Sequence, residues 1–113
     1  YSHAAGDDRI VFLSGQTPLQ PGTTQLVSGD TAAQTLQCLE NLSAVLSSAG
    51  LTTADVVKCN VFLTDMADFA EMNAAYASFF HATYPARTTV GVAALPLGAS
   101  VEIEMVALRS GRT

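Results

Sequence analysis

Positive charge is scarce in this sequence of 113 residues, which has five Lys and Arg residues against ten acidic ones. The formal net charge at pH 7 is −5. Proteins that bind nucleic acids need clustered Lys and Arg side chains to neutralise phosphates, so this composition argues against a nucleic-acid groove. It also gives an anionic ligand little long-range electrostatic attraction, so any recognition of such a ligand must be local.

Cysteine and histidine are also scarce, with two residues of each type. Cys38 and Cys59 lie far apart, and neither His3 nor His81 has another His, Cys or carboxylate at metal-ligand spacing. No metal site is therefore predicted. No apolar run reaches the roughly 18 residues of a membrane-spanning helix, and the glycines form no phosphate-binding pattern. We expect a cytoplasmic protein with two free, buried cysteines, no cofactor, no nucleic-acid partner and no membrane partner.

The periodicity of apolar residues predicts strands and helices within one domain that spans residues 1–113. Hydrophobic residues make up 49% of the chain, enough for a single core. Apolar runs predict strands at residues 9–15, 25–27, 56–63, 87–95 and 101–108. Helical periodicity predicts one helix from the N-cap Asp30 to Ala49, and a second from Asp65 or Asp68 to a point before Pro85.

This β-β-α-β-α-β-β order predicts an α+β fold, a mixed sheet with both helices on one face. Two hairpins are expected. One joins strands 9–15 and 25–27 through a loop with Pro18 and Gly22, and the other joins strands 87–95 and 101–108 through Pro96 and Gly98. The sequence offers no third layer to cover the second face of the sheet. Another copy of the same chain is the obvious cover.

Arg87 is the one cation without a simple surface or terminal explanation; the others are Arg9, Lys58, Arg109 and Arg112. It follows Pro85 and opens an apolar run that is predicted to be a buried strand. A buried charge without a partner is costly. The guanidinium therefore needs either an internal acidic neighbour, which is the more common case, or a ligand. Its planar fork fits a carboxylate bidentately, so a receptor for a small acid is the alternative.

Glu102 and Glu104 form a second charged group, since strand alternation places both carboxylates on one face. In the expected hairpin, Glu102 lies nearer Val92 or Ala93 than Arg87. Contact between Arg87 and Glu102 would therefore need strand bending or a neighbouring subunit. From the residues alone, a solvated or interfacial strand face is the favoured interpretation of the two glutamates.

Short motifs along nearly the whole chain are similar to those of one known family. In order, they are Tyr1-Ser2, Phe12-Leu13-Ser14-Gly15-Gln16, Gln34 with Asn41-Leu42, Ala49-Gly50-Leu51, Asp55-Val56-Val57-Lys58, Asp68-Phe69 with Asn73 and Tyr76, Pro85-Ala86-Arg87, and Val101-Glu102-Ile103-Glu104. Each motif alone is weak, but their order and spacing together resemble the RidA (YjgF) family of reactive enamine/imine deaminases. The resemblance implies a chorismate-mutase-like α+β fold that assembles as a homotrimer, with the sheets around a central barrel and ligand clefts between subunits.

The resemblance also implies roles for individual residues. Arg87 would bind the substrate carboxylate, and Glu102 would act on the hydrolytic water. The residues expected to bind substrate together with Arg87 are Tyr1, Ser14, Gly15, Asn73 and Thr89. The best-known family members have cysteine at the position of Thr89. Their ligands use the backbone there, which threonine also supplies, whereas thiol chemistry at this position is excluded.

The activity implied is the cofactor-independent hydrolysis of enamine/imine intermediates, such as 2-aminoacrylate and 2-iminopropionate, to 2-keto acids and ammonia. Two alternatives remain. One is a carboxylate-binding regulatory trimer without catalysis, which needs Arg87 but not Glu102. The other is an endoribonuclease or translation inhibitor, a label also attached to the family, and the acidic composition counts against it.

Overall fold

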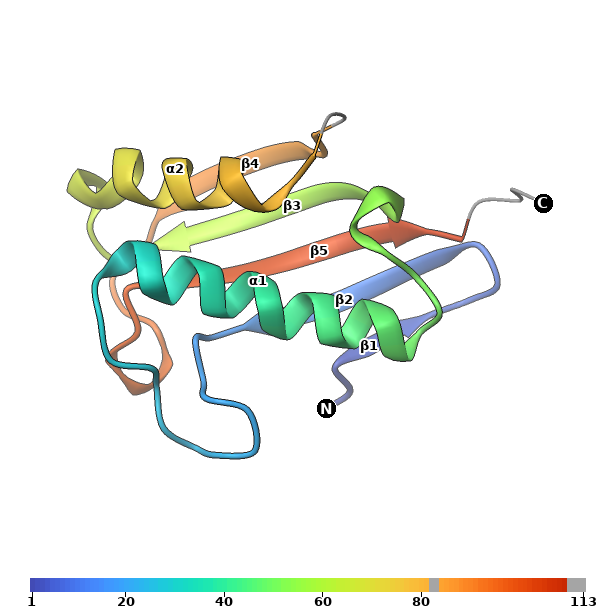
Figure 1. Ribbon diagram of the computed structural model, residues 1–113, viewed down its shortest axis with the longest axis horizontal. Coiled ribbons are helices and arrows are strands. Elements are labelled where there is room, and N and C mark those ends of the chain that lie inside the picture. Colours follow the sequence, from blue (N-terminus) through green and yellow to red (C-terminus); the bar gives the residue numbers. More distant parts are fainter. Residues whose placement is uncertain (82–83, 110–113) are drawn as a thin grey trace.

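The chain folds into a five-stranded mixed sheet with two helices on one face (Figure 1). The structure is a computed structural model that describes residues 1–81 and 84–109. The elements are β1 (Ala4–Gly6), β2 (Ile10–Gln16), α1 (Thr31–Ser48), β3 (Val56–Leu63), α2 (Phe69–Phe79), β4 (Ala86–Gly91) and β5 (Val101–Leu108). The predicted α+β class and the mixed sheet with both helices on one face are confirmed. The last residues of the predicted domain, including Arg112, lie outside the described residues.

The strand order is β1-β2-β5-β3-β4, which places β5 at the centre and β4 at an edge. β3 and β4 are parallel and are linked by α2, whereas the other neighbours are antiparallel. The predicted hairpin between strands 87–95 and 101–108 is therefore wrong. After β4 ends, the chain passes through a 3₁₀ turn at Pro96–Gly98 and inserts β5 between β2 and β3. The burial pattern of β5 fits a central strand, because every second residue from Val101 to Ala107 is buried.

The first hairpin also differs from the expected one. Residues 25–27 form no strand and contribute only an isolated bridge between Leu19 and Leu26. The hairpin partner of β2 is instead β1, and the Asp7 carboxylate between them accepts hydrogen bonds of 2.8 Å from the backbone N–H groups of Arg9 and Ile10. Such side-chain turns are typical of aspartate. Ala4–Gly6 consists of small residues with weak strand preference, which is why its sequence predicted no strand.

The core lies between the sheet and the helices. Asp30 caps α1 as predicted, because its side chain accepts a hydrogen bond of 2.9 Å from the Ala33 N–H. The buried face of α1 comprises Thr31, Thr35, Cys38, Leu39, Leu42 and Leu46. Both cysteines are free and buried as predicted, and burial raises the pKa of each thiol. These thiols therefore behave as small apolar core groups.

In the part of the chain that the structure describes, no helix covers the other face of the sheet, called the open face below (Figure 1). Strand alternation and burial place on it Phe12 and Ser14 of β2, Lys58, Asn60 and Phe62 of β3, Thr88 and Val90 of β4, and Glu102, Glu104, Val106 and Leu108 of β5. Phe12 is 57% exposed and Leu108 is 40% exposed. Large apolar side chains gathered on one face are typical of a surface that binds a partner. Among the described residues, no helix has the length and apolar character to cross a membrane.

The N-cap of α1 can be tested by two substitutions at one position. Asp30→Ala removes the acceptor for the Ala33 N–H, so we expect the free energy of unfolding to fall by about 0.5–2 kcal/mol. Asp30→Asn keeps a side-chain oxygen at the cap and should leave the stability close to wild type. Urea unfolding followed by circular dichroism measures both variants. Equal stability of the alanine and wild-type proteins would contradict the role of this cap.

Candidate functional site

The Arg87 side chain lies between the edge strand β4 and helix α2. Its Nη1 donates a hydrogen bond of 2.7 Å to the Asn73 Oδ1. Its guanidinium carbon lies 4.7 Å from the centroid of the Tyr76 ring and 5.6 Å from that of Phe69. Among the described residues, no carboxylate forms an ion pair with it. The structure therefore shows no internal salt bridge for Arg87 within the described residues, and its partners there are neutral.

Helical spacing brings these three partners to one place. Phe69, Asn73 and Tyr76 stand at positions i, i+4 and i+7 of α2, so they share one face of the helix. The parallel pairing of β3 and β4 sets Arg87 opposite Cys59 on the helix-covered side of the sheet. One face of α2 and the edge strand β4 thus jointly fix the guanidinium.

A hollow adjoins this guanidinium. It has a volume of about 310 Å³ and is lined by Asn73, Tyr76, Ala77, Tyr84, Pro85 and Arg87. Thr89 lies two residues beyond Arg87 on the same side of β4, and its Oγ1 is buried without a hydrogen-bond partner among the described residues. A cation with no acidic partner at the wall of a hollow can accept a small anion.

Glu102 lies in a second group, on the open face. A Cβ atom built on Gly15 would lie 2.6 Å from the Glu102 Oε2, so a side chain at this position of β2 would displace the carboxylate from its present place. The neighbouring Ser14 Oγ donates a hydrogen bond of 2.6 Å to the Ser2 carbonyl oxygen. This bond ties the N-terminal segment to β2, and the Tyr1 side chain beyond it is fully exposed.

The environment of Glu102 favours its protonated form. Burial, followed by repulsion from Glu104, raises the pKa of Glu102. The Glu104 Oε2 accepts a hydrogen bond of 3.1 Å from the Asn60 Nδ2. A raised pKa brings a carboxyl group closer to the neutral range in which general acids and bases work best.

The sheet separates these two groups within one chain. Arg87, Asn73 and Thr89 lie on the helix-covered side at β4, whereas Glu102, Gly15 and Ser14 lie on the open face at β5 and β2. β3 stands between β4 and β5, and Glu102 pairs with Phe62 rather than with any residue of β4. The earlier placement of Glu102 beside Val92 or Ala93 is therefore wrong, because it assumed a hairpin that does not form.

Comparison with known proteins identifies the family. A family model described as Endoribonuclease L-PSP matches residues 1–109. The chain belongs to this family, which is the RidA (YjgF) family. Protein DfrA of Myxococcus xanthus is 48% identical to it over 110 residues, which cover 96% of this chain and 84% of that protein. The 2-iminobutanoate/2-iminopropanoate deaminase of Homo sapiens is 42% identical over 113 residues, which cover 100% of this chain and 82% of that protein.

The fold agrees with solved structures of RidA-family proteins. The crystal structure of the YjgF gene product from E. coli superposes with a TM-score of 0.92 at 42% sequence identity, and the match covers 97% of this chain and 88% of that one. Within residues 1–81 and 84–109, no cluster of three or more His, Cys, Asp or Glu side chains is placed to hold a metal ion.

The aromatic partners of Arg87 were missed as functional residues in the sequence. From the sequence alone, Phe69 and Tyr76 are recognised only as residues of the family motifs within the second predicted helix. Their spacing relative to Asn73 contains a usable signal, because i, i+4 and i+7 place all three on one helical face. What the sequence does not contain is the pairing of β4 with β3, which brings that face to Arg87.

The partners of Arg87 among the described residues are neutral, so adding one negative charge beside it should change its ability to bind an anion. Asn73→Asp keeps an oxygen for the 2.7 Å hydrogen bond but neutralises the guanidinium, and its charge repels an incoming carboxylate. If a small carboxylate such as 2-ketobutyrate binds at this guanidinium, we expect its affinity, measured by isothermal titration calorimetry, to fall about tenfold or more. The melting temperature should not fall, since an ion pair replaces a neutral hydrogen bond. Unchanged affinity would show that the anion binds elsewhere.

Proposed function

We propose that this RidA-family chain hydrolyses reactive enamine/imine intermediates, such as 2-aminoacrylate and 2-iminopropionate, to 2-keto acids and ammonia. The observation that carries the proposal is the Arg87 guanidinium, which has no acidic partner among the described residues and lies beside a hollow. A 2-imino acid offers the carboxylate that such a group binds. The name of the human relative, a 2-iminobutanoate/2-iminopropanoate deaminase, supports the same substrate class.

In this proposal Arg87 holds the substrate carboxylate and thereby orients the imine carbon towards a water molecule. Glu102 accepts a proton as the water oxygen bonds to that carbon, and it passes this proton to the imine nitrogen to give a neutral carbinolamine. Glu102 then takes the hydroxyl proton as the carbonyl of the 2-keto acid forms, and it delivers that proton to the amine, which leaves as ammonia when the carbon–nitrogen bond breaks. Acid–base assistance of this kind contributes about 10²–10⁴-fold. The raised pKa of Glu102 suits both proton transfers.

The proposed site requires more than one chain, because the sheet separates Arg87 from Glu102. We place it in a cleft between subunits of a homotrimer. One subunit would supply Arg87 with Asn73 and Thr89, and its neighbour would supply Glu102 with Tyr1, Ser14 and Gly15. The exposed apolar side chains of the open face, among them Phe12 and Leu108, support burial against other copies.

A carboxylate-binding trimer without catalysis is the second candidate. The observation that favours it is that the surroundings of Arg87 are assembled within one chain, whereas Glu102 lies on the other side of the sheet. An endoribonuclease is less well supported, although the family is described as Endoribonuclease L-PSP. The net charge is −5, and the amine of Lys58 donates to the Thr88 hydroxyl at 2.8 Å rather than joining a basic patch.

A coupled assay tests the deaminase proposal. 2-Aminoacrylate is generated in situ by a dehydratase, and ammonia release above the spontaneous rate is measured. Arg87→Ala should lower kcat/KM about 10–100-fold through loss of charged hydrogen bonds. Glu102→Gln should lower kcat about 10²–10⁴-fold while the affinity for 2-ketobutyrate remains.

The exposed Arg9 provides the matched control, and Arg9→Ala should leave the rate unchanged. If Arg87→Ala were as active as wild type, the deaminase proposal would be wrong. Binding of 2-ketobutyrate that survives Glu102→Gln, together with no turnover by the wild type, would establish the second candidate instead.

The repulsion between Glu104 and Glu102 predicts that neutralising Glu104 shifts the pH profile of kcat/KM. Activity should fall as the pH drops through the pKa of Glu102, because the water then lacks its base. Glu104→Gln removes a repulsion that raises this pKa, so the acidic limb of kcat/KM against pH should move to lower pH. Glu40→Gln, an exposed change on α1, should not move it. An unmoved limb in Glu104→Gln would contradict this assignment of Glu102.

A further inference from the structure

The rings of Phe69 and Tyr76 on α2 lie beside the Arg87 guanidinium, which is the proposed carboxylate-binding group. We propose that Phe69 and Tyr76 are positioning residues, which fix the Arg87 guanidinium without neutralising its charge. This inference rests on the proposed function, since it concerns how the same site binds a carboxylate. It assigns to two residues, otherwise part of helix packing, a role in ligand affinity.

Three contacts with uncharged groups hold the guanidinium. The ring centroids of Tyr76 and Phe69 lie 4.7 Å and 5.6 Å from the guanidinium carbon, within the range of cation–π attraction. The third contact is the hydrogen bond to the Asn73 amide oxygen. Each partner attracts a cation and none has a net charge. The three together restrict the guanidinium while its full positive charge stays available to an anion.

Tyr76 acts through its ring rather than through its hydroxyl. The residue is 4% exposed, and its Oη is buried without a hydrogen-bond partner among the described residues. Burial raises the pKa of the Tyr76 hydroxyl, so the hydroxyl stays protonated and supplies no phenolate to pair with Arg87. The nearby Cys59 thiol also remains neutral, because burial raises its pKa. No group of this cluster therefore competes with an incoming carboxylate.

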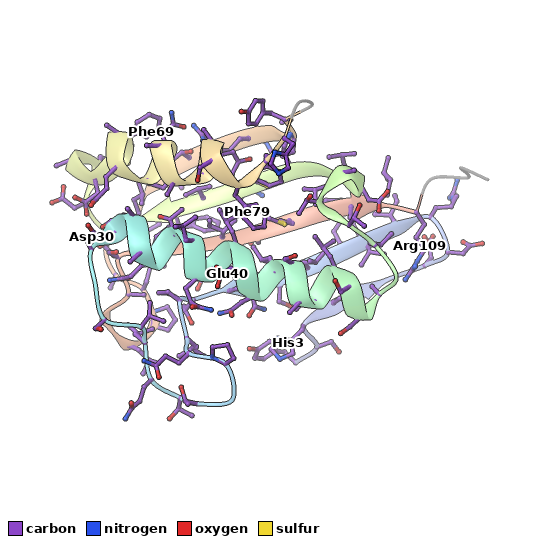
Figure 2. All side chains as sticks on the ribbon, viewed as in Figure 1. His3, Asp30, Glu40, Phe69, Phe79 and Arg109 are labelled. Carbon is purple, nitrogen blue, oxygen red and sulfur yellow. The ribbon has the colours of Figure 1, made fainter. Side chains whose placement is uncertain are left out.

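Phe69 offers a substitution that spares the core. It is 37% exposed, whereas Tyr76 belongs to the buried core cluster. Phe79, on the same helix, packs its ring against Phe80 with centroids 5.3 Å apart and belongs to the residues packed on the core. Figure 2 labels both Phe69 and Phe79 on α2. Phe79→Leu is thus the matched control. It removes a phenyl ring from the same helix, and this ring is not one of the two found over the Arg87 guanidinium.

The test compares Phe69→Leu, Phe69→Tyr and Phe79→Leu in the full chain. Calorimetry with 2-ketobutyrate gives the dissociation constant, and a melting curve reports stability. We expect Phe69→Leu to weaken binding about three- to tenfold. Phe69→Tyr restores a ring and should bind within about twofold of wild type. Phe79→Leu should lower the melting temperature but leave the dissociation constant unchanged.

A second readout needs no ligand. The rings shift the nuclear magnetic resonance signal of the Arg87 Nε–H group, and Arg87→Lys identifies that signal by its loss. Phe69→Leu should move it and Phe79→Leu should not. A signal that stays in place in Phe69→Leu, or affinity equal to wild type, overturns the positioning role. A wild-type protein that binds 2-ketobutyrate through this cluster but releases no ammonia overturns the deaminase proposal alone.

Discussion

The candidate site depends on one constraint, a guanidinium whose partners within residues 1–81 and 84–109 are all neutral. Removing an arginine from water costs free energy that an internal carboxylate usually offsets. Here Asn73, Tyr76 and Phe69 supply a hydrogen bond and two ring faces in its place. These contacts are weaker than an ion pair, so part of the electrostatic attraction of Arg87 remains unused. The arrangement favours any anion that can reach the hollow beside it.

The position of Arg87 follows from the crossover between β3 and β4. A parallel pair needs a long connection, and α2 provides it while covering the sheet. The same connection sets the face with Phe69, Asn73 and Tyr76 over the edge strand. One topological feature therefore builds a core helix and the surroundings of Arg87 together. It also leaves β5 free to occupy the centre of the sheet and to carry Glu102 to the opposite face.

The sequence predicted what depends on local physics. The cap at Asp30, the alternation of β5 and the unusual chemistry of Arg87 can each be recognised within a few residues. Pairing between distant segments could not be predicted in this way. The turn at Pro96–Gly98 looks the same whether the next strand returns beside β4 or crosses to β2, and Ala4–Gly6 is a strand only because β2 offers it a partner. The partners of Arg87 were missed for the same reason, since they depend on how β4 pairs.

The separation of Arg87 from Glu102 has a physical advantage for the proposed chemistry. Two opposite charges that met within one chain would form an ion pair, which would lower the pKa of the glutamate and occupy the arginine. The intervening sheet prevents this self-neutralisation. Arg87 keeps its charge for a carboxylate, and burial with the nearby Glu104 keeps the pKa of Glu102 raised. In a cleft between copies the two groups would then meet across the substrate, whose carboxylate would offset the charge of Arg87. Each group could thus keep the protonation behaviour that its own chain gives it until the complex forms.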